Sequence, residues 1–283
     1  MKFRRQVGRA RPVATVMMLI AGMAQTTPLA AAQVGEEAAY QRCLSEITLN
    51  PNQAFDEALI WRDQGGGIPA RHCAALALIA LEEYAAAAER LEELADQSAT
   101  RAAAQAMRPD MLGQAGNAWL LADRPDRAYS ALSGALALLP ETAPARADLL
   151  IDRARALAAQ EQWAAAEADL SASLSLAPER VAGYIFRATA RRFLEQFDAA
   201  LEDIDTALAL DPERAEALLE RGILHRLAGR DDAARRDWLK LLTMTEEGPA
   251  ATAAQRNLEM MDVDLSRDGN GDGDGAATAG HAR

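Results

Sequence analysis

The sequence predicts an all-α protein, a right-handed α-solenoid of about five helix–turn–helix units between an N-terminal helix pair and a C-terminal capping helix. The first observation is a 34-residue period in Ala147–Leu242. Four sets of positions repeat with this spacing: Leu150, Tyr184 and Leu218; Ala154, Ala188 and Gly222; Ala166, Ala200 and Ala234; and Leu170, Ile204 and Trp238. Such a period is typical of stacked helix pairs, each of which buries its apolar face against its neighbours.

Two further observations support this fold class. The eighth and twentieth positions of each unit carry small residues, which let the two helices of a pair cross closely. No segment shows the alternating β-branched pattern of a strand. We therefore expect helices throughout.

The first 32 residues resemble a secretory signal peptide. A basic leader with Lys2, Arg4 and Arg5 precedes the apolar run Val13–Met23, and small residues end at Ala32. The run is shorter than the roughly 20 apolar residues of a membrane span, so a membrane anchor is the weaker alternative. We expect cleavage near Ala32 and an exported, soluble periplasmic or secreted protein.

The N-terminal helical pair is expected at 33–67, where Asn50 can cap the second helix and three glycines end it. Cys43 and Cys73 lie on either side of this turn. In an oxidising compartment they can form a disulfide that fastens the opening helices to the first regular unit, whereas two buried free thiols are the alternative.

The repeat frame divides the remaining chain. The five units are expected at 68–101, 109–142, 147–180, 181–214 and 215–248. A capping helix is predicted at 249–263, and a Gly- and Asp-rich disordered tail at 264–283. The tail resembles the first half of a calcium loop, but Ala279 stands where the loop needs a glutamate.

An opposite-charge pair also follows the period. Arginine occupies the seventh position and aspartate the twenty-third in three successive units: Arg153 with Asp169, Arg187 with Asp203, and Arg221 with Asp237. Because acid and base recur together, we interpret them as structural salt bridges between helices. A row of ligand-binding arginines is the alternative interpretation.

The pattern resembles the tetratricopeptide repeat family over about 68–248. The matching residues include Leu150, Ala154, Ala166, Pro178, Tyr184, Ala188, Ala200, Pro212, Leu218, Gly222, Ala234 and Trp238. The eleventh position departs from the family, since Arg191 and His225 replace its aromatic residue.

The resemblance implies that the first helices line a concave groove for a peptide or protein segment. The groove residues it implies are Asn117, Arg155, Ile185, Thr189, Arg192, Ile223 and Arg226. Arginines in this set suggest a peptide of some acidic character, or merely a solvated surface.

Charge and motifs exclude several functions. Removing the five leader cations changes the net charge from −12 to −17, which disfavours nucleic acid and anionic lipid. The three histidines are scattered, and metal-ligand and nucleophile motifs are absent, so we expect no enzyme, no cofactor and no metal.

The sequence therefore predicts a non-catalytic protein–protein interaction scaffold or adaptor in the cell envelope. A periplasmic chaperone-like or assembly factor is the alternative, and an enzyme is the remote one. The partner and the oligomeric state are left open.

Overall fold

The computed structural model describes residues 28–99 and 105–271, with side chains from 35 to 263. All regular elements in these ranges are helices, which confirms the predicted all-α class. The opening helices are α1 (Pro28–Leu49), α2 (Pro51–Asp63), α3 (Gly67–Ala80) and α4 (Tyr84–Ser98). The middle helices are α6 (Arg108–Leu121), α7 (Pro125–Ala137), α8 (Arg146–Ala159) and α9 (Trp163–Leu176). The last are α10 (Val181–Phe193), α11 (Phe197–Leu210), α12 (Ala215–Leu227), α13 (Asp231–Met244) and α14 (Pro249–Gly271).

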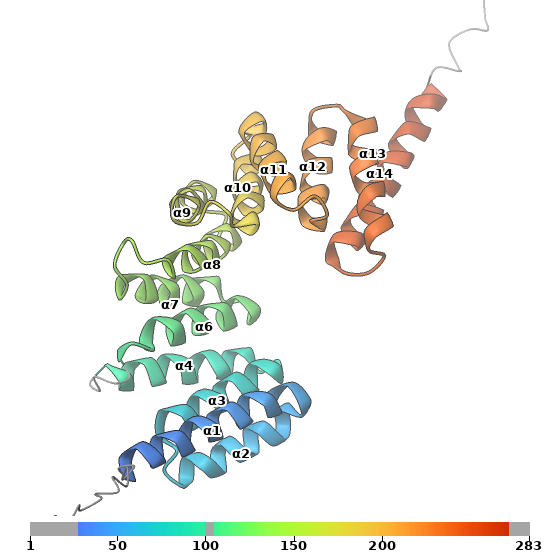
Figure 1. Cartoon of the computed structure of the whole chain (residues 1–283). Helices are drawn as coiled ribbons and strands as arrows, with labels where there is room; N and C mark the ends of the chain where they lie inside the picture. Colours follow the sequence, from blue (N-terminus) through green and yellow to red (C-terminus); the bar gives the residue numbers. More distant parts are fainter. Residues whose placement is uncertain (1–27, 100–104, 272–283) are drawn as a thin grey trace, which may run out of the picture.

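The helices form antiparallel pairs that stack in chain order along a curved path. Figure 1 shows α1–α4 at one end of the stack and α12–α14 at the other. The first helices of successive units contact one another, α6 with α8, α8 with α10 and α10 with α12. In the described residues the second helices of successive units approach each other less. The first helices therefore line the inner side of the curve.

Close helix crossings explain the small residues of the period. Ala154, Ala166, Ala188 and Ala200 are almost fully buried where the helices of their pairs meet. At the equivalent place in the last unit, a Cβ on Gly222 would lie 2.2 Å from Trp238 Nε1. Any side chain there would push α12 away from α13.

The turn inside each unit has one conformation that was not expected from the sequence. The fifteenth residue of every unit has positive φ, and four of the five are not glycine: Glu82, Asp123, Glu161, Glu195 and Gly229. Positive φ is costly for residues with a Cβ. In each unit the amide after this residue donates to the carbonyl five residues before it, as Glu83 does to Leu78 at 2.9 Å. This hydrogen bond ends the first helix of the unit through a left-handed residue.

The two ends of the chain differ from the expected boundaries. Helix α1 begins at Pro28, so the expected cleavage position near Ala32 falls inside it, while residues 1–27 of the expected signal peptide lie outside the described residues. Helix α14 runs through Gly271, past the boundary expected at 263. Each added residue of a growing helix gains a backbone hydrogen bond, which permits this extension through polar sequence. Residues 272–283 of the expected tail lie outside the described ranges.

Two packing details tie the N-terminal pair to the stack. Asn50 caps α2 by accepting a hydrogen bond from the Gln53 amide at 3.2 Å. Cys43 of α1 and Cys73 of α3 form a disulfide with a Cα–Cα distance of 6.3 Å. Within the described residues, no helix has the length and apolar content needed to cross a bilayer.

Candidate functional site: an apolar pocket on the inner face

An apolar pocket of about 380 Å³ opens between α8, α9 and α10. Its lining residues are Ala154, Arg155, Ala158, Ala159, Trp163, Ala166, Leu170, Phe186 and Thr189. Since α8 and α10 are neighbouring first helices, the pocket lies where the inner face of the curve passes from one unit to the next. Its size is that of a site for a large side chain or a small ligand.

The pocket exists because of two small residues. Ala158 and Ala159 occupy the twelfth and thirteenth positions of their unit, at the end of α8. The other four units have larger residues at the twelfth position, namely Ile79, Leu120, Arg192 and Arg226. The repeat frame was known from the sequence, so an alignment of these positions could have located the pocket.

Aromatic side chains form the rim. Trp163 and Phe193 stack face to face, with ring centroids 3.9 Å apart and an interplanar angle of 6°. Phe186 is 37% exposed and Phe193 is 50% exposed, although both are large apolar residues. The Arg192 guanidinium lies 4.5 Å from the centre of the Phe193 ring. An exposed aromatic rim around an apolar pocket is typical of a binding surface.

The groove arginines already have carboxylate partners. Arg155 pairs with Asp152 at 3.1 Å and Arg192 with Glu220 at 2.6 Å. Arg226 pairs with Asp231 at 2.7 Å. A partner's carboxylate would have to compete with these acids, so the idea of an acidic peptide finds little support in the geometry.

The remaining groove residues differ in their environments. Asn117 donates to Asp152 at 2.7 Å and accepts from Arg155 at 3.3 Å, which fixes both groups beside the pocket. The Thr189 hydroxyl lines the pocket and donates to the carbonyl of Ile185 at 3.1 Å. Ile185 is only 7% exposed and belongs to a core cluster, and Ile223 packs against the next one. Ile185 therefore has little surface left for a partner, whereas Ile223 is partly buried.

The periodic arginines form bidentate salt bridges. Arg153 binds Asp169 through Nε and Nη2, both at 2.7 Å, and Arg187 binds Asp203 at 2.9 and 2.7 Å. Arg221 binds Asp237 at 2.8 and 2.7 Å. Hydrogen bonding to the aspartate raises the pKa of each arginine above its ordinary value. Because two guanidinium nitrogens of each arginine bind the aspartate, these arginines hold the two helices of their unit together.

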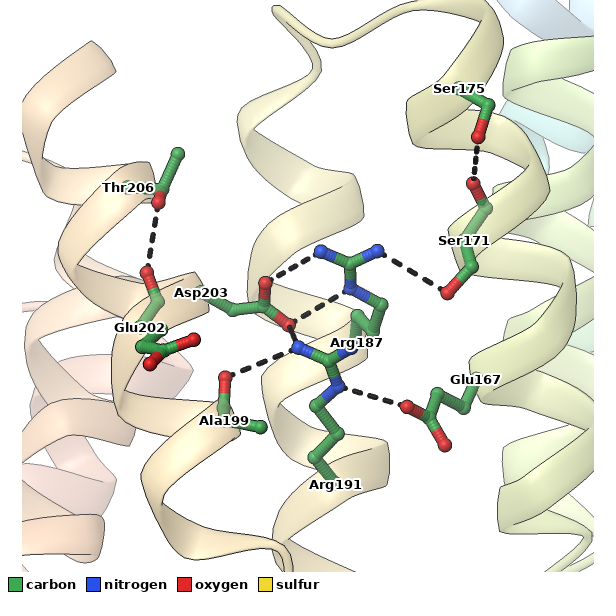
Figure 2. Close-up of polar contacts among 9 residues, drawn as sticks. All are labelled: Glu167, Ser171, Ser175, Arg187, Arg191, Ala199, Glu202, Asp203 and Thr206. Atoms are coloured by element: carbon green, nitrogen blue, oxygen red, sulfur yellow. Dashed lines mark hydrogen bonds and ion pairs between the residues drawn. The ribbon is translucent and has the colours of Figure 1, made fainter.

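Each of these arginines also reaches back to the preceding unit. The third guanidinium nitrogen, Nη1, donates a hydrogen bond to a side chain of that unit. Arg153 donates to Ser133, Arg187 to Ser171 and Arg221 to Asp205. Figure 2 shows the middle case, where Arg191 adds a second guanidinium on Asp203 and binds Glu167. We call the three Arg–Asp pairs and these contacts the ionic ladder. The spacing of the periodic residues predicts the pair within a unit and gives no sign of the link between units.

A polar cluster lies beside the disulfide. His72 Nδ1 is 2.6 Å from the Tyr40 hydroxyl and its Nε2 is 2.7 Å from Gln114 Oε1, so it joins α1, α3 and α6. Burial lowers the pKa of His72 below its ordinary value near 6.5. Since Cys73 is bonded to Cys43, this cluster holds no thiol nucleophile. The part of the chain that the structure describes contains no group of His, Cys, Asp and Glu placed to hold a metal ion.

Comparison with known proteins rests on structure. No protein-family model and no curated protein matches the chain. PilF of Pseudomonas aeruginosa superposes with a TM-score of 0.62 at 16% identity, covering 80% of this chain and 99% of PilF. MamA from Desulfovibrio magneticus RS-1 gives 0.51 at 20% identity, covering 67% of this chain and 95% of its own.

A third similar structure is YrrB, described as a TPR protein with an unusual peptide-binding site. Its TM-score is 0.50 at 17% identity, and the match covers 72% of this chain and 98% of YrrB. These identities are low, so the likeness concerns the backbone arrangement. Together with the 34-residue helix pairs, it shows that this chain has the tetratricopeptide repeat fold.

Proposed function

We propose that this protein is a non-catalytic interaction scaffold or adaptor that binds a peptide or protein segment on the inner face of its solenoid. The observation that carries the proposal is the apolar pocket between α8, α9 and α10. An apolar cavity with an exposed aromatic rim suits an anchoring side chain from a partner. Peptide binding by YrrB, a protein of the same fold, agrees with this use of the fold.

The cell envelope is the proposed place of action. Its support is the basic and apolar leader in the sequence together with the Cys43–Cys73 disulfide, because disulfides persist in oxidising compartments. The acidic net charge of −12 argues against nucleic acid as the partner. We propose one protein partner and no membrane insertion of the mature chain.

A chaperone-like or assembly factor is the second candidate. The exposed aromatic residues Phe186, Phe193 and Phe197 would suit contact with many unfolded segments. A scaffold differs from a chaperone in the number of clients that depend on the same pocket. The two candidates can therefore be separated by one capture experiment.

The test is chemical crosslinking in the native compartment, followed by mass spectrometry of what is captured. Ala159→Phe introduces a phenylalanine at the thirteenth position, where the following unit already has Phe193. Ala159 is exposed and lines the pocket, so the new ring fills the pocket. Ala85→Phe on α4, also at an exposed alanine, is the matched control. We expect one dominant partner, lost in Ala159→Phe and kept in Ala85→Phe.

Two other outcomes would change the proposal. Many captured clients that all depend on the pocket would favour the chaperone-like function. A dominant partner that is captured equally by both variants would contradict binding at this pocket.

A further inference from the structure

A second, acidic pocket adjoins the apolar pocket along the same groove. It encloses about 330 Å³ between the start of α8 and the start of α10. Its lining residues are Asp148, Ile151, Asp152, Glu179, Arg180, Val181 and Ala182. Three carboxylates and one guanidinium therefore surround this space.

The two pockets share the same faces of the same two helices. On α8, residues 148, 152, 155 and 159 follow each other at spacings of three or four, which is one helix face. On α10, Ala182 of the acidic pocket and Phe186 and Thr189 of the apolar pocket also lie on one helix face, at spacings of four and three residues. The acidic and apolar pockets are therefore successive parts of one groove, which the Asn117–Asp152–Arg155 network divides.

The charge of the groove follows from its ion pairs. Asp148 is satisfied by Arg180 at 2.9 Å, and Asp152 is satisfied by Arg155. Glu179 is exposed and forms no ion pair with any described residue, so one carboxylate of the groove is left uncompensated. The Arg180–Asp148 pair is itself largely exposed, with about half of each side chain in solvent. Exposed pairs of this kind are weak and exchange readily with a competing cation.

We propose that the groove selects a segment in which a large apolar side chain lies about 10 Å from a lysine or arginine. The inference rests on the proposed function and specifies its partner. The two pocket centres are about seven residues apart along α8, which corresponds to roughly 10 Å at 1.5 Å per residue. An extended peptide spans this distance in about three residues. The apolar side chain enters between Trp163 and Phe186, and the cation faces Glu179 and Asp148.

The test uses defined peptides and the purified full chain. Fluorescein-labelled probes carry Lys-Ala-Ala-Phe or the reverse order Phe-Ala-Ala-Lys between glycines, with glutamate for lysine or serine for phenylalanine as comparison probes. Fluorescence anisotropy gives the dissociation constants at low and high salt. We expect the better lysine probe to bind about fivefold tighter than its glutamate form at low salt, and less so at high salt.

Two variants separate the parts of the groove. Ala159→Phe should weaken the phenylalanine probes at least tenfold without changing the weak binding of the serine probes. Asp148→Asn/Glu179→Gln should abolish the preference for lysine and leave the glutamate probe unchanged or tighter. The control Asp198→Asn/Glu202→Gln removes the same charge from exposed positions of α11 and should keep the preference.

The outcomes distinguish this inference from the function on which it rests. Equal binding of lysine and glutamate probes, with the natural partner still lost in Ala159→Phe, would overturn the inference and leave the scaffold function standing. A preference for lysine that survives Asp148→Asn/Glu179→Gln would also overturn it, because the cation would then lie elsewhere. If Ala159→Phe still bound both the phenylalanine probes and the natural partner, the inference and the scaffold function would both be contradicted.

Discussion

The two halves of the solenoid use the same repeat but different stabilising contacts. In the C-terminal half, from α8 to α13, the ionic ladder links the helices of each unit and the unit before it. In the N-terminal half, from α1 to α7, the seventh position is alanine, at Ala74 and Ala115. There the links are the Cys43–Cys73 disulfide and a cluster in which Trp119 and Arg127 both bind Glu92.

The comparison separates what the repeat requires from what it tolerates. Both halves keep the small residues at the helix crossings, so these determine how a pair packs. The periodic Arg–Asp pairs occur in the C-terminal half only, so a unit can form without them. They add stability and order between units that already have the right geometry.

The largest expected effect is at the centre of the ladder. Asp203→Ala leaves two largely buried guanidinium groups, Arg187 and Arg191, without their shared carboxylate, which is 5% exposed. Breaking one partner of a buried ion pair costs about 3–5 kcal/mol. Urea unfolding followed by circular dichroism measures the loss. Asp169→Ala removes the carboxylate partner of Arg153 alone, so it should lower the free energy of unfolding by less. If Asp203→Ala lowered it by the same amount or less than Asp169→Ala, the role of Arg191 would be contradicted.

The next effect concerns the covalent link of the N-terminal half. Cys43→Ala/Cys73→Ala should lower the free energy of unfolding by roughly 3–4 kcal/mol, since the bond closes a loop of about 30 residues. Hydrogen exchange should show faster opening of α1 to α3 and no change in α10 to α13. Wild type treated with a reductant is the control and should match. Faster exchange throughout the chain would mean that the two halves do not unfold independently.

A glycine pair tests the geometry that both halves share. A Cβ at Gly116 would lie 2.4 Å from Leu132 Cγ, and one at Gly222 lies as close to Trp238. Alanine at either site should therefore cost about 1–3 kcal/mol through overpacking. Gly134→Ala is the control, because its nearest neighbour would be Leu112 Cδ1 at 3.5 Å. This variant should gain about 0.5–1 kcal/mol, and thermal unfolding compares all three.

The smallest expected effect is a pH dependence in the N-terminal half. Because burial lowers the pKa of His72, the unfolded chain binds a proton near pH 6.5 while the folded chain does not. Stability is therefore present above pH 6.5 and is lost as the pH falls below it. Hydrogen exchange of α1 and α3 between pH 7 and pH 5, corrected for intrinsic rates, should show this loss. His72→Gln should flatten it, and an unchanged slope in that variant would place the titrating group elsewhere.

Much of the fold followed from the periodic residues. The spacing of Ala154, Ala188 and Gly222 was enough to predict helix pairs, because small residues at crossings are a direct requirement of packing. The left-handed turn residues such as Glu161 could not be predicted, since three of the five are glutamates, a residue type that does not favour positive φ. Their conformation belongs to the hydrogen bond that ends the first helix of each unit, such as the one from Gln162 to Leu157.

The site was less predictable than the fold. The sequence drew attention to Arg155, Arg192 and Arg226, because charge is visible in a sequence. Whether an arginine is already paired depends on acids that are distant in sequence, such as Glu220 for Arg192. The pocket is a space left by Ala158 and Ala159, and its signal is the twelfth position, where Ala158 is smaller than its counterparts in the other four units.

The most direct test of the central claim is site-specific photocrosslinking from the pocket rim. Phe186 lines the pocket and Phe197 does not, and both are 37% exposed. Each is replaced in turn by p-benzoylphenylalanine, which keeps the aromatic shape, and the crosslinked proteins are identified after irradiation in cells. We predict that residue 186 captures the dominant partner and residue 197 does not. Equal capture from both positions, or capture from residue 197 alone, would contradict binding in the pocket between α8, α9 and α10.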